Sequence, residues 1–413
     1  MEIVRFRKYG KRPNFFNPNV NDIDFLDSIC YLALIIKKCE EYPLAVLIEN
    51  GNELESKELY ELYIKNNSIN QYTNKYVEPD NSPYTKYWSQ ISSKLNGIKK
   101  IFYSPDGIYN QINIQTLFNP KTLKYLIDEI EIEQLTSTRD IIFASDNENI
   151  FKTKSVAIFG NSFTDHQFEN LEISINIDKT ERTRKISTIT QNIYSFMKYN
   201  IFSPLPGVFE ELKTISNLFK LKKWETNLYF NNDCKEETLK NMKSPSLLHI
   251  ASHGAYIKNH YNDHLNFNTY KDVEIEDALT RSFLILKLLV PEDLNNNNNN
   301  QLEDGILTAK EVMNLRLDST DLVVLSVCES GLGCIVPGEG VYGLQRAFLI
   351  AGAKNLMISL WSISDGSTKH FICNFYKNII SGKLIKEAYR ITQKQLIKEY
   401  TPAVWGSFIL VNK

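Results

Sequence analysis

The chain has 413 residues and a formal net charge of −2, so it is long enough for two or three compact units and carries no basic excess that would favour nucleic acid. No apolar stretch is long enough to cross a bilayer, and the first residues contain no apolar secretory segment. We therefore expect no nucleic acid and no membrane as direct partners. Six scattered cysteines, without the paired spacing of a zinc site, predict a reduced, cytoplasmic compartment.

The first part of the chain alternates patterns for strands and helices. Apolar runs at residues 31–36 and 43–48 predict a hairpin, and the charged segment at residues 54–64 predicts a helix. Residues 65–83, which are rich in Asn, Tyr, Pro and Asp, predict a loop. Further strands are expected at residues 100–103 and 130–133.

A new series of strands and helices begins at residue 155. We place the boundary just before it, so that residues 1–150 form a smaller N-terminal α/β subdomain and residues 153–413 the main domain. Strands are expected there at residues 155–160, 227–230, 247–252, 322–327, 356–361 and 405–411, and helices at residues 206–219, 236–242, 340–352, 367–380 and 385–399. Such alternation predicts an α/β fold with a mostly parallel sheet and helices on both faces.

Two long segments of the main domain predict irregular structure. Residues 164–203 are polar and indicate an exposed insertion. The excursion at about residues 257–304 contains six consecutive asparagines, which cannot bury apolar surface. It therefore predicts a flexible loop.

Two of the predicted strands lead to reactive residues. The apolar run at residues 247–252 precedes His253, and the run at residues 322–327 precedes Cys328. An open α/β sheet builds its active site at the carboxyl ends of its strands. A thiol and an imidazole at these positions predict a nucleophile and its general base.

Each of these residues has a simpler interpretation when it is taken alone. A cysteine after an apolar strand is usually an inert core residue, and a single histidine is most often structural. The joint occurrence of Cys328 and His253 at two strand ends favours the catalytic interpretation. We expect His249 to point to the other side of its strand or to lie in the core. Cys334 is treated as incidental.

A series of motifs resembles the CHAT family of cysteine peptidases, which are relatives of caspases and separase. The motifs follow one another in order over about residues 30–413, and this order makes the resemblance specific. They are SPDG (104–107), LPG (205–207) with EE (210–211), LHIASHG (248–254), LSVCESG (325–331), GEGVYGL (338–344), AGA (351–353), SLW (359–361) with Asp365, and WGSF (405–408). The chain departs from the family pattern at Val327, where Ala is frequent, and at Ser330, where Thr is frequent.

The resemblance implies a cysteine endopeptidase with a caspase-like fold and a Cys328–His253 dyad. The backbone N–H groups of Gly254 and Cys328 would form the oxyanion hole, and a glycine after the histidine lets a substrate approach the backbone closely. Residues 1–150 would resemble an inactive caspase-like half. No metal or organic cofactor is expected.

The same resemblance suggests a biological setting and a set of partners. It implies regulated proteolysis in signalling or defence, with a protein or peptide as substrate. A regulatory protein or an N-terminal repeat domain is the further partner that we expect.

Two acidic residues are candidates for substrate binding. In separase-like relatives, an acidic residue near the position of Asp365 binds a basic side chain before the cleaved bond, and a carboxylate facing Arg or Lys gives charge-assisted recognition. The alternative for Asp365 is a helix N-cap, because Gly, Ser and Thr follow it. Glu339 is the second candidate, and its alternative is a first-turn carboxylate at a helix N-terminus.

Two other functions compete with proteolysis. Residues 338–343 match the dinucleotide fingerprint GxGxxG, but about ten residues separate them from the preceding strand, whereas the fingerprint needs a tight strand-to-helix turn. A nucleotide-binding α/β enzyme is therefore disfavoured. The second alternative is a catalytically silent module that binds a peptide or protein.

Overall fold

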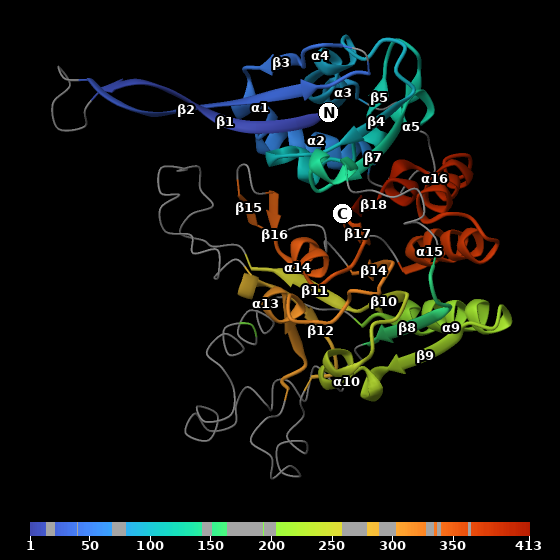
Figure 1. Cartoon of the computed structure of the whole chain (residues 1–413). Helices are drawn as coiled ribbons and strands as arrows, with labels where there is room; N and C mark the ends of the chain where they lie inside the picture. Colours follow the sequence, from blue (N-terminus) through green and yellow to red (C-terminus); the bar gives the residue numbers. More distant parts are fainter. Residues whose placement is uncertain are drawn as a thin grey trace. The chain divides into compact units, whose positions relative to one another are not determined.

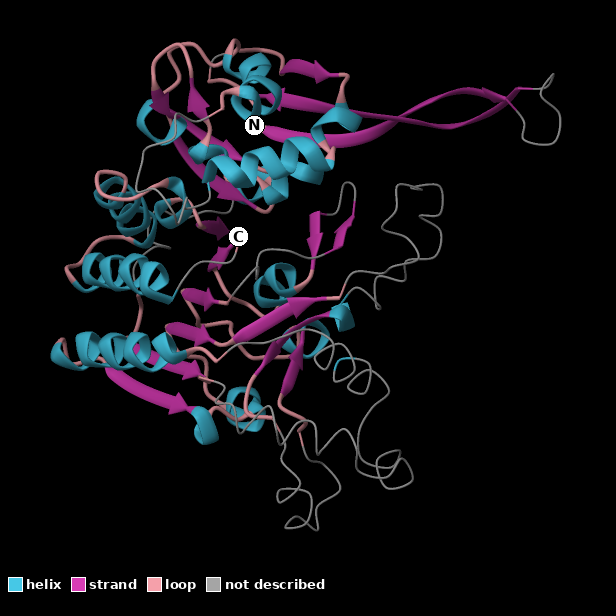
Figure 2. Cartoon of the chain, turned by 180° about the vertical axis from the view of Figure 1, so that it is seen from behind, coloured by secondary structure: helices cyan, strands magenta, loops and turns pink. Residues whose placement is uncertain are grey.

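The computed structural model describes residues 1–13, 21–38, 40–67, 80–142, 151–162, 193, 204–257, 279–288, 303–327, 334–336, 340–361 and 365–413 (Figures 1 and 2). The chain divides into two compact units. The first unit consists of Met1–Ala144, Ile335–Val341 and Leu396–Lys413, and the second of Ser145–Cys334 and Tyr342–Gln395. The last strand of the chain thus groups with the N-terminal residues.

The first unit begins with an antiparallel sheet of three strands. These strands are β1 (Glu2–Pro13), β2 (Asn21–Ile35) and β3 (Leu44–Ile48), in the order β1-β2-β3. Only residues 31–35 of β2 pair with β3, which confirms the predicted hairpin. The rest of β2 pairs with β1 alone, as far as Pro13↔Asn21, and forms a two-stranded ribbon (Figure 1).

The first unit also contains parallel strands and short helices. Its parallel strands have the order β4-β7-β18, with β4 at Lys100–Tyr103, β7 at Glu131–Leu135 and β18 at Phe408–Asn412. Its further elements include α1 (Gly51–Leu54), α2 (Lys57–Asn67), α3 (Ser82–Tyr87), α4 (Ser89–Ser92), β5 (Phe118–Asn119), β6 (Lys124–Tyr125), α5 (Leu126–Glu129) and α17 (Pro402–Trp405).

Two side-chain hydrogen bonds attach the C-terminal segment to the first unit. The Nδ2 atom of Asn113 donates to the Gly406 carbonyl at 2.7 Å, and Nδ2 of Asn412 donates to the Gln134 carbonyl at 3.0 Å. Gly406 has to be a glycine here, because a Cβ atom would lie 2.2 Å from Cγ2 of Thr116. These contacts explain why residues far apart in the sequence form one unit.

The second unit is built on five parallel strands. Their order is β17 (Asn355–Ser359), β14 (Leu322–Ser326), β10 (Leu247–Ala251), β8 (Ser155–Gly160) and β9 (Glu225–Phe230). All four pairings are parallel. The central strands are nearly continuous apolar runs because a parallel sheet is buried on both faces.

Helices cover both faces of these strands. Figures 1 and 2 show α9 (Pro206–Leu221) and α15 (Asp365–Ile380) on one face, and α13 (Ala309–Val312) and α14 (Leu344–Ile350) on the other. The remaining helices that concern this unit are α10 (Glu236–Asn241) and α16 (Ile385–Leu396). The predicted α/β class, with a mostly parallel sheet and helices on both faces, is confirmed. Among the helices of the described ranges, none combines the length and apolarity that crossing a bilayer requires.

The second unit also contains a small antiparallel sheet, whose first strand begins just after β10 in the sequence. It contains β11 (His253–Tyr256), β12 (Ser282–Ile285) and β13 (Ile306–Thr308). β12 falls within the predicted loop at 257–304, so this part of the prediction was wrong: its short apolar segment is fully buried. The rest of that loop, at 258–278 and 289–302, lies outside the described residues, as does the predicted insertion at 164–203 apart from Ile193.

A second short hairpin precedes α14. It consists of β15 (Cys334–Val336) and β16 (Gly340–Tyr342). The sequence predicted a helix from residue 340, but the helix begins at Leu344, because the preceding residues pair as a strand. The dinucleotide fingerprint therefore includes a strand instead of opening a helix, which argues further against nucleotide binding.

Candidate active site

The two strands that lead to His253 and Cys328 lie side by side in the second unit. β10 and β14 pair in parallel, and their last pair is Ala251↔Ser326, so they end at the same level. His253 follows the end of β10 by two residues and begins β11. Cys328 follows the end of β14 by two residues in the sequence, but it lies outside the described residues.

The step from β10 to β11 is fixed by contacts with β12. His253 is 8% exposed and pairs with Ile285 in the antiparallel ladder. The preceding residue, Ser252, is buried, and its hydroxyl donates a hydrogen bond to the Ile285 carbonyl. The backbone that carries the imidazole is therefore held by both a side chain and a ladder.

The residue after the histidine contacts the residue before the cysteine. A Cβ atom on Gly254 would lie 2.5 Å from Cγ1 of Val327 and 3.1 Å from the Phe283 carbonyl oxygen. Both distances are shorter than ordinary contacts, so any other residue at 254 would push the two segments apart. The glycine thus permits close packing of the two strand ends, in addition to the expected approach of a substrate.

The ladder between β11 and β12 also orients the N–H group of Gly254. The register pairs Gly254 with Leu284, and the N–H of Ile257 donates to the Arg281 carbonyl at 3.0 Å. Hydrogen-bonded and non-hydrogen-bonded pairs alternate along an antiparallel ladder. Gly254, three residues before Ile257, therefore belongs to a non-hydrogen-bonded pair, and its N–H group points away from β12.

The peptide before Cys328 is anchored as well. Val327 is 3% exposed, and its carbonyl accepts a hydrogen bond from the hydroxyl of Ser359. Ser359 is the last residue of β17, which pairs with β14. The sequence marks Ser359 only as a polar residue that ends an apolar strand within the SLW motif.

The other histidine of β10 belongs to the core. His249 is fully buried, with its Nδ1 atom 2.9 Å from the Tyr376 hydroxyl and its Nε2 atom 3.2 Å from Oε1 of Glu211. The contact with Tyr376 ties the strand to α15, whereas the carboxyl group of Glu211 on α9 lies close to the imidazole without a hydrogen bond to it. Burial, together with the nearby Glu211, raises the pKa of Tyr376. The prediction that His249 lies in the core is confirmed.

Three cysteines of the described residues are poor nucleophiles. Cys30, Cys234 and Cys373 are free thiols, and all three are buried. Burial raises the pKa of each thiol, to about 12 for Cys234. Because the thiolate is the reactive form, these residues are unreactive at neutral pH. Cys39 and the side chain of Cys334 lie outside the described parts of the chain.

Most of the chain matches the model of one protein family. The model of the CHAT domain matches residues 82–413. The chain belongs to the CHAT domain family. The match begins at α3, so this CHAT domain draws on both compact units.

Curated relatives match the chain over a shorter segment. Tetratricopeptide repeat protein 28 of Mus musculus is 32% identical over 115 residues, which are 27% of this chain and 5% of that protein. The Homo sapiens protein of the same name is 33% identical over 115 residues, or 27% of this chain and 4% of that protein. The chain therefore corresponds to only a small part of the length of these relatives.

Solved structures resemble the chain with low sequence identity. The complex of Porphyromonas gingivalis RgpB pro- and mature domains aligns with a TM-score of 0.42 and 9% identity, over 86% of this chain and 75% of that one. The Arg-specific cysteine proteinase gingipain R (RGPB) aligns with a TM-score of 0.42 and 7% identity, over 88% and 75% of the two chains.

The two acidic candidates of the CHAT domain are placed only in part. Asp365 is the first residue of α15, a position in which a carboxylate is stabilising whether or not it binds a substrate. Its side chain and the whole of Glu339 lie outside the described residues.

One carboxylate cluster in the described ranges has the spacing of a metal site. Oxygen atoms of Glu236, Glu303 and Glu311 lie within 4.8 Å of one another. The ammonium group of Lys240 contacts all three, at 2.7, 2.6 and 3.0 Å. Burial raises the pKa of Glu236 to about 9, although the hydrogen bond from Lys240 opposes the shift. The lysine thus supplies the positive charge that a cation would bring.

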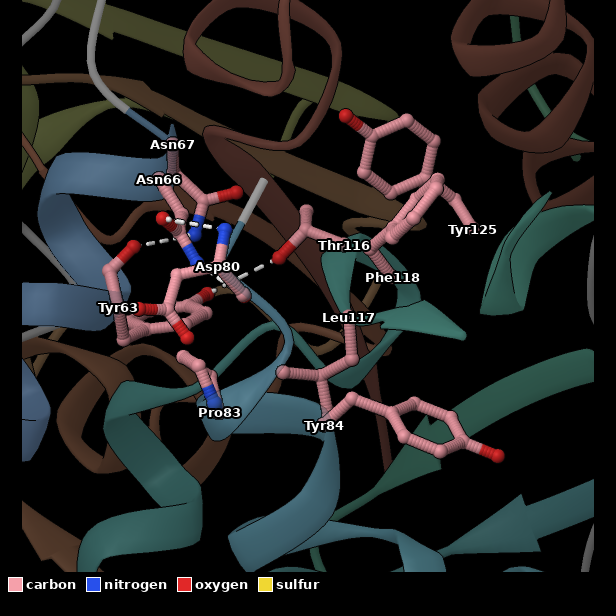
Figure 3. Close-up of a pocket in the computed structure, with 10 residues that line it drawn as sticks. All are labelled: Tyr63, Asn66, Asn67, Asp80, Pro83, Tyr84, Thr116, Leu117, Phe118 and Tyr125. Atoms are coloured by element: carbon pink, nitrogen blue, oxygen red, sulfur yellow. Dashed lines mark hydrogen bonds between the residues drawn. The ribbon is translucent and has the colours of Figure 1, made fainter. Parts of the chain in front are cut away.

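A cavity in the first unit is too small for a substrate. Figure 3 shows its lining, which includes Tyr63, Asn67 and Thr116. Its volume is about 10 Å³, roughly the space that one water molecule needs. The Oδ1 atom of Asn67 is buried there without a protein partner, while its Nδ2 donates to the Tyr63 carbonyl at 2.8 Å. Such a cavity suits a water molecule and takes no peptide or cofactor.

Proposed function

We propose that the chain is a cysteine endopeptidase that hydrolyses peptide bonds through Cys328 and His253. The observation that carries the proposal is the contact between Gly254 and Val327. Each of these residues is one peptide unit from a member of the dyad, and neighbouring Cα atoms are about 3.8 Å apart. Such spacing supports a thiol and an imidazole within reach of each other at the ends of β10 and β14.

The proposed reaction proceeds through an acyl-enzyme. The Cys328 thiol transfers its proton to His253 and attacks the scissile carbonyl carbon. The resulting oxyanion accepts hydrogen bonds from the N–H groups of Gly254 and Cys328. The imidazolium protonates the leaving amine, and a thioester remains. Water, deprotonated by His253, then hydrolyses the thioester and restores the thiol, so no metal or organic cofactor is required.

The orientation of the Gly254 N–H group supports this oxyanion hole. Because Gly254 belongs to a non-hydrogen-bonded pair, its N–H group is not used by β12. The state of the described cysteines supports the choice of nucleophile, because Cys30, Cys234 and Cys373 are buried with raised pKa values. Their free thiols also suit the proposed reducing, cytoplasmic compartment.

Substrate selection is proposed to involve acidic side chains. Asp365, and secondarily Glu339, would bind a basic residue before the cleaved bond. The alternative role was a helix N-cap, but α15 begins at Asp365 itself, one position after a cap, where a carboxylate also stabilises the helix. Substitution distinguishes the two interpretations, since only substrate binding makes the cleavage preference depend on the carboxylate.

Residues 1–150 are proposed to form an inactive caspase-like half, and residues 153–413 the catalytic domain. The name of the curated relatives refers to tetratricopeptide repeats. A repeat domain or a regulatory protein is therefore our proposed partner in regulated proteolysis, in signalling or defence.

The test is a peptide-library digest with the purified chain, beside Cys328→Ala and His253→Ala. We expect cleavage by the parent chain and none by Cys328→Ala. Asp365→Ala should abolish a preference for basic residues, and an unchanged preference would favour the helix-stabilising role. Cleavage that survives in Cys328→Ala would refute the nucleophile.

A silent binding module is the alternative function. It predicts peptide binding without cleavage and without His253-dependent labelling of Cys328 by an electrophilic peptide probe. Saturable binding of NAD, NADP or ATP in isothermal titration would instead favour a nucleotide-binding enzyme.

A further inference from the structure

The hydrogen bond from Ser359 to Val327 lies at a special position in the sheet. Both residues are 3% exposed, so the bond is shielded from water. The backbone pairing of β14 with β17 runs from Val323↔Leu356 to Leu325↔Ile358. Val327 lies two residues beyond that last pair. The serine side chain therefore holds β14 at the point where the backbone ladder has ended.

This bond acts on the peptide unit that joins Val327 to Cys328. The carbonyl of one residue and the N–H group of the next belong to one planar unit, and in the trans form they point in opposite directions. A hydrogen bond that fixes the Val327 carbonyl therefore fixes the direction of the following N–H group. A hydroxyl donor also polarises the peptide and strengthens its N–H as a donor.

A second contact restrains the same peptide from another side. The Val327 side chain packs against Gly254, whose own N–H group points away from β12. The peptide is thus held by Ser359 through its carbonyl and by Gly254 through the adjacent side chain. Two restraints of this kind are what a preorganised pair of donors requires.

We propose that Ser359 is a positioning residue for the oxyanion hole. Its hydroxyl holds the Val327–Cys328 peptide so that the N–H group of Cys328 faces the oxyanion of the tetrahedral intermediate, together with the N–H group of Gly254. This role rests on the proposed peptidase function and concerns the transition state more than substrate binding. In this role Ser359 acts through the peptide that it holds and not through contact with the substrate.

The decisive experiment compares Ser359→Thr with Ser359→Val. The two side chains have nearly the same shape, and only threonine retains the hydroxyl. On a fluorogenic peptide substrate, we expect kcat of Ser359→Val to fall about 10-fold below that of Ser359→Thr with KM unchanged, somewhat less than the 10²–10³ reported for deletion of a whole oxyanion donor. The rate of Cys328 alkylation by iodoacetamide should be equal in both, because displacement at carbon forms no oxyanion.

Two controls keep the comparison interpretable. Ser359→Ala adds no atoms to the buried site, so it replaces Ser359→Val if that variant does not fold. Ser407→Ala removes another buried serine hydroxyl that donates to a backbone carbonyl, that of Val404 at 2.9 Å, and it should leave kcat unchanged. Thermal unfolding of each variant measures the loss of stability separately.

The outcomes distinguish the role of Ser359 from the proposed peptidase function. Equal kcat values for the Thr and Val variants, in a chain that cleaves peptides, would overturn the role of Ser359 and leave the peptidase intact. A fall in alkylation rate that parallels the fall in kcat would also overturn it, because the thiol itself would then be disturbed. Absence of cleavage and of His253-dependent alkylation in the parent chain would overturn both proposals.

Discussion

Gly254 and Val327 are in direct contact, with the glycine Cα placed so that a Cβ atom would come within 2.5 Å of the valine Cγ1. The two residues are 73 positions apart in the sequence, on segments that follow neighbouring parallel strands. They flank His253 and Cys328 in the sequence, so a change in their contact should disturb the proposed dyad as well as the packing of the two segments.

Gly254→Ala should damage both stability and cleavage. The added methyl group overlaps Val327 and approaches the Phe283 carbonyl at 3.1 Å, so the segments must separate. Overpacking of this kind costs about 1–3 kcal/mol in the free energy of unfolding. Urea unfolding and kcat/KM on a peptide substrate measure the two effects. Gly366→Ala is the matched control for stability, because a Cβ atom there meets nothing within 4 Å.

A second substitution should rescue the first. Val327→Ala removes the atom that the new methyl group meets, so Gly254→Ala combined with Val327→Ala should be more stable than the sum of the single effects implies. The recovery should remain partial, because the Phe283 carbonyl still lies close. Strict additivity in the double-mutant cycle would show that Gly254 and Val327 do not interact in solution.

Cysteine labelling should be selective in the folded chain. With iodoacetamide near neutral pH, Cys328 should react first, whereas Cys30, Cys234 and Cys373 should react only after unfolding, because burial raises their pKa values. His253→Ala should slow the labelling of Cys328 about 10-fold, since an unassisted thiol of pKa about 8.5 is only a few per cent thiolate. Peptide mapping by mass spectrometry identifies the modified residue, and fast labelling of Cys234 in the folded chain would contradict its burial.

Lys240→Met should destabilise the chain more at pH 8 than at pH 4.5. The ammonium group bonds the carboxyl groups of Glu236, Glu303 and Glu311, and without it the negative charge of this cluster, which is greater at pH 8 than at pH 4.5, is left uncompensated. Loss of its charged hydrogen bonds should cost about 2 kcal/mol at pH 8. Lys383→Met is the control, because its pair with Glu387 is largely exposed and such pairs contribute little.

Glu236 should add its own pH dependence to the parent chain. Burial raises its pKa from 4.5 to about 9, so the folded state holds this proton more tightly than the unfolded state does. The stability that follows is complete below pH 4.5 and is lost as the pH rises through about 9. Glu236→Gln should flatten the stability profile between these values in urea unfolding, and an unchanged slope would contradict the raised pKa.

Tyr376→Phe should lower stability and spare catalysis. The substitution removes the hydroxyl that lies 2.9 Å from Nδ1 of the fully buried His249, and an unpaired buried polar atom costs about 1–3 kcal/mol. Cleavage measured well below the melting temperature should stay within about 2-fold, because the pair lies outside the proposed dyad. Tyr42→Phe, on a side chain that is 72% exposed, should have no effect. A large loss of kcat in Tyr376→Phe would give His249 a role in the reaction.

The sequence was most informative about the parallel strands. β10, β14 and β17 are nearly continuous apolar runs because both faces of a parallel sheet are covered, and such runs can be recognised in the sequence alone. β1 was missed because basic residues interrupt it. Arg5 is nevertheless buried, and its Nη2 atom donates a hydrogen bond to Oε2 of Glu55 at 3.0 Å. The two residues are 50 positions apart, so no local sequence pattern predicts their pairing. β12 was missed because its apolar run is short and lies within a polar segment.

For the candidate site, the sequence indicated where the strands end but not the hydrogen bonds and contacts that hold these ends in place. The positions of His253 and Gly254 after β10 follow from the apolar run and the motif. The hydrogen bond from Ser359 to Val327 joins a side chain of one strand to the backbone at the end of another, and no periodic pattern in the sequence predicts such a bond. Asp365 is placed only by the start of α15, so its role stays a prediction.

Because of the β1–β2 ribbon, the amide hydrogens of the N-terminal sheet should be protected from exchange with solvent to two different degrees. Residues 31–34 of β2 have strand neighbours on both sides, whereas residues 21–30 lie beside β1 alone. An isolated two-stranded hairpin is marginally stable in water, so local opening can detach the far part while the sheet persists. Amide hydrogens in that far part should exchange with solvent well before those of β3, and trimming there would shorten the chain without unravelling the unit.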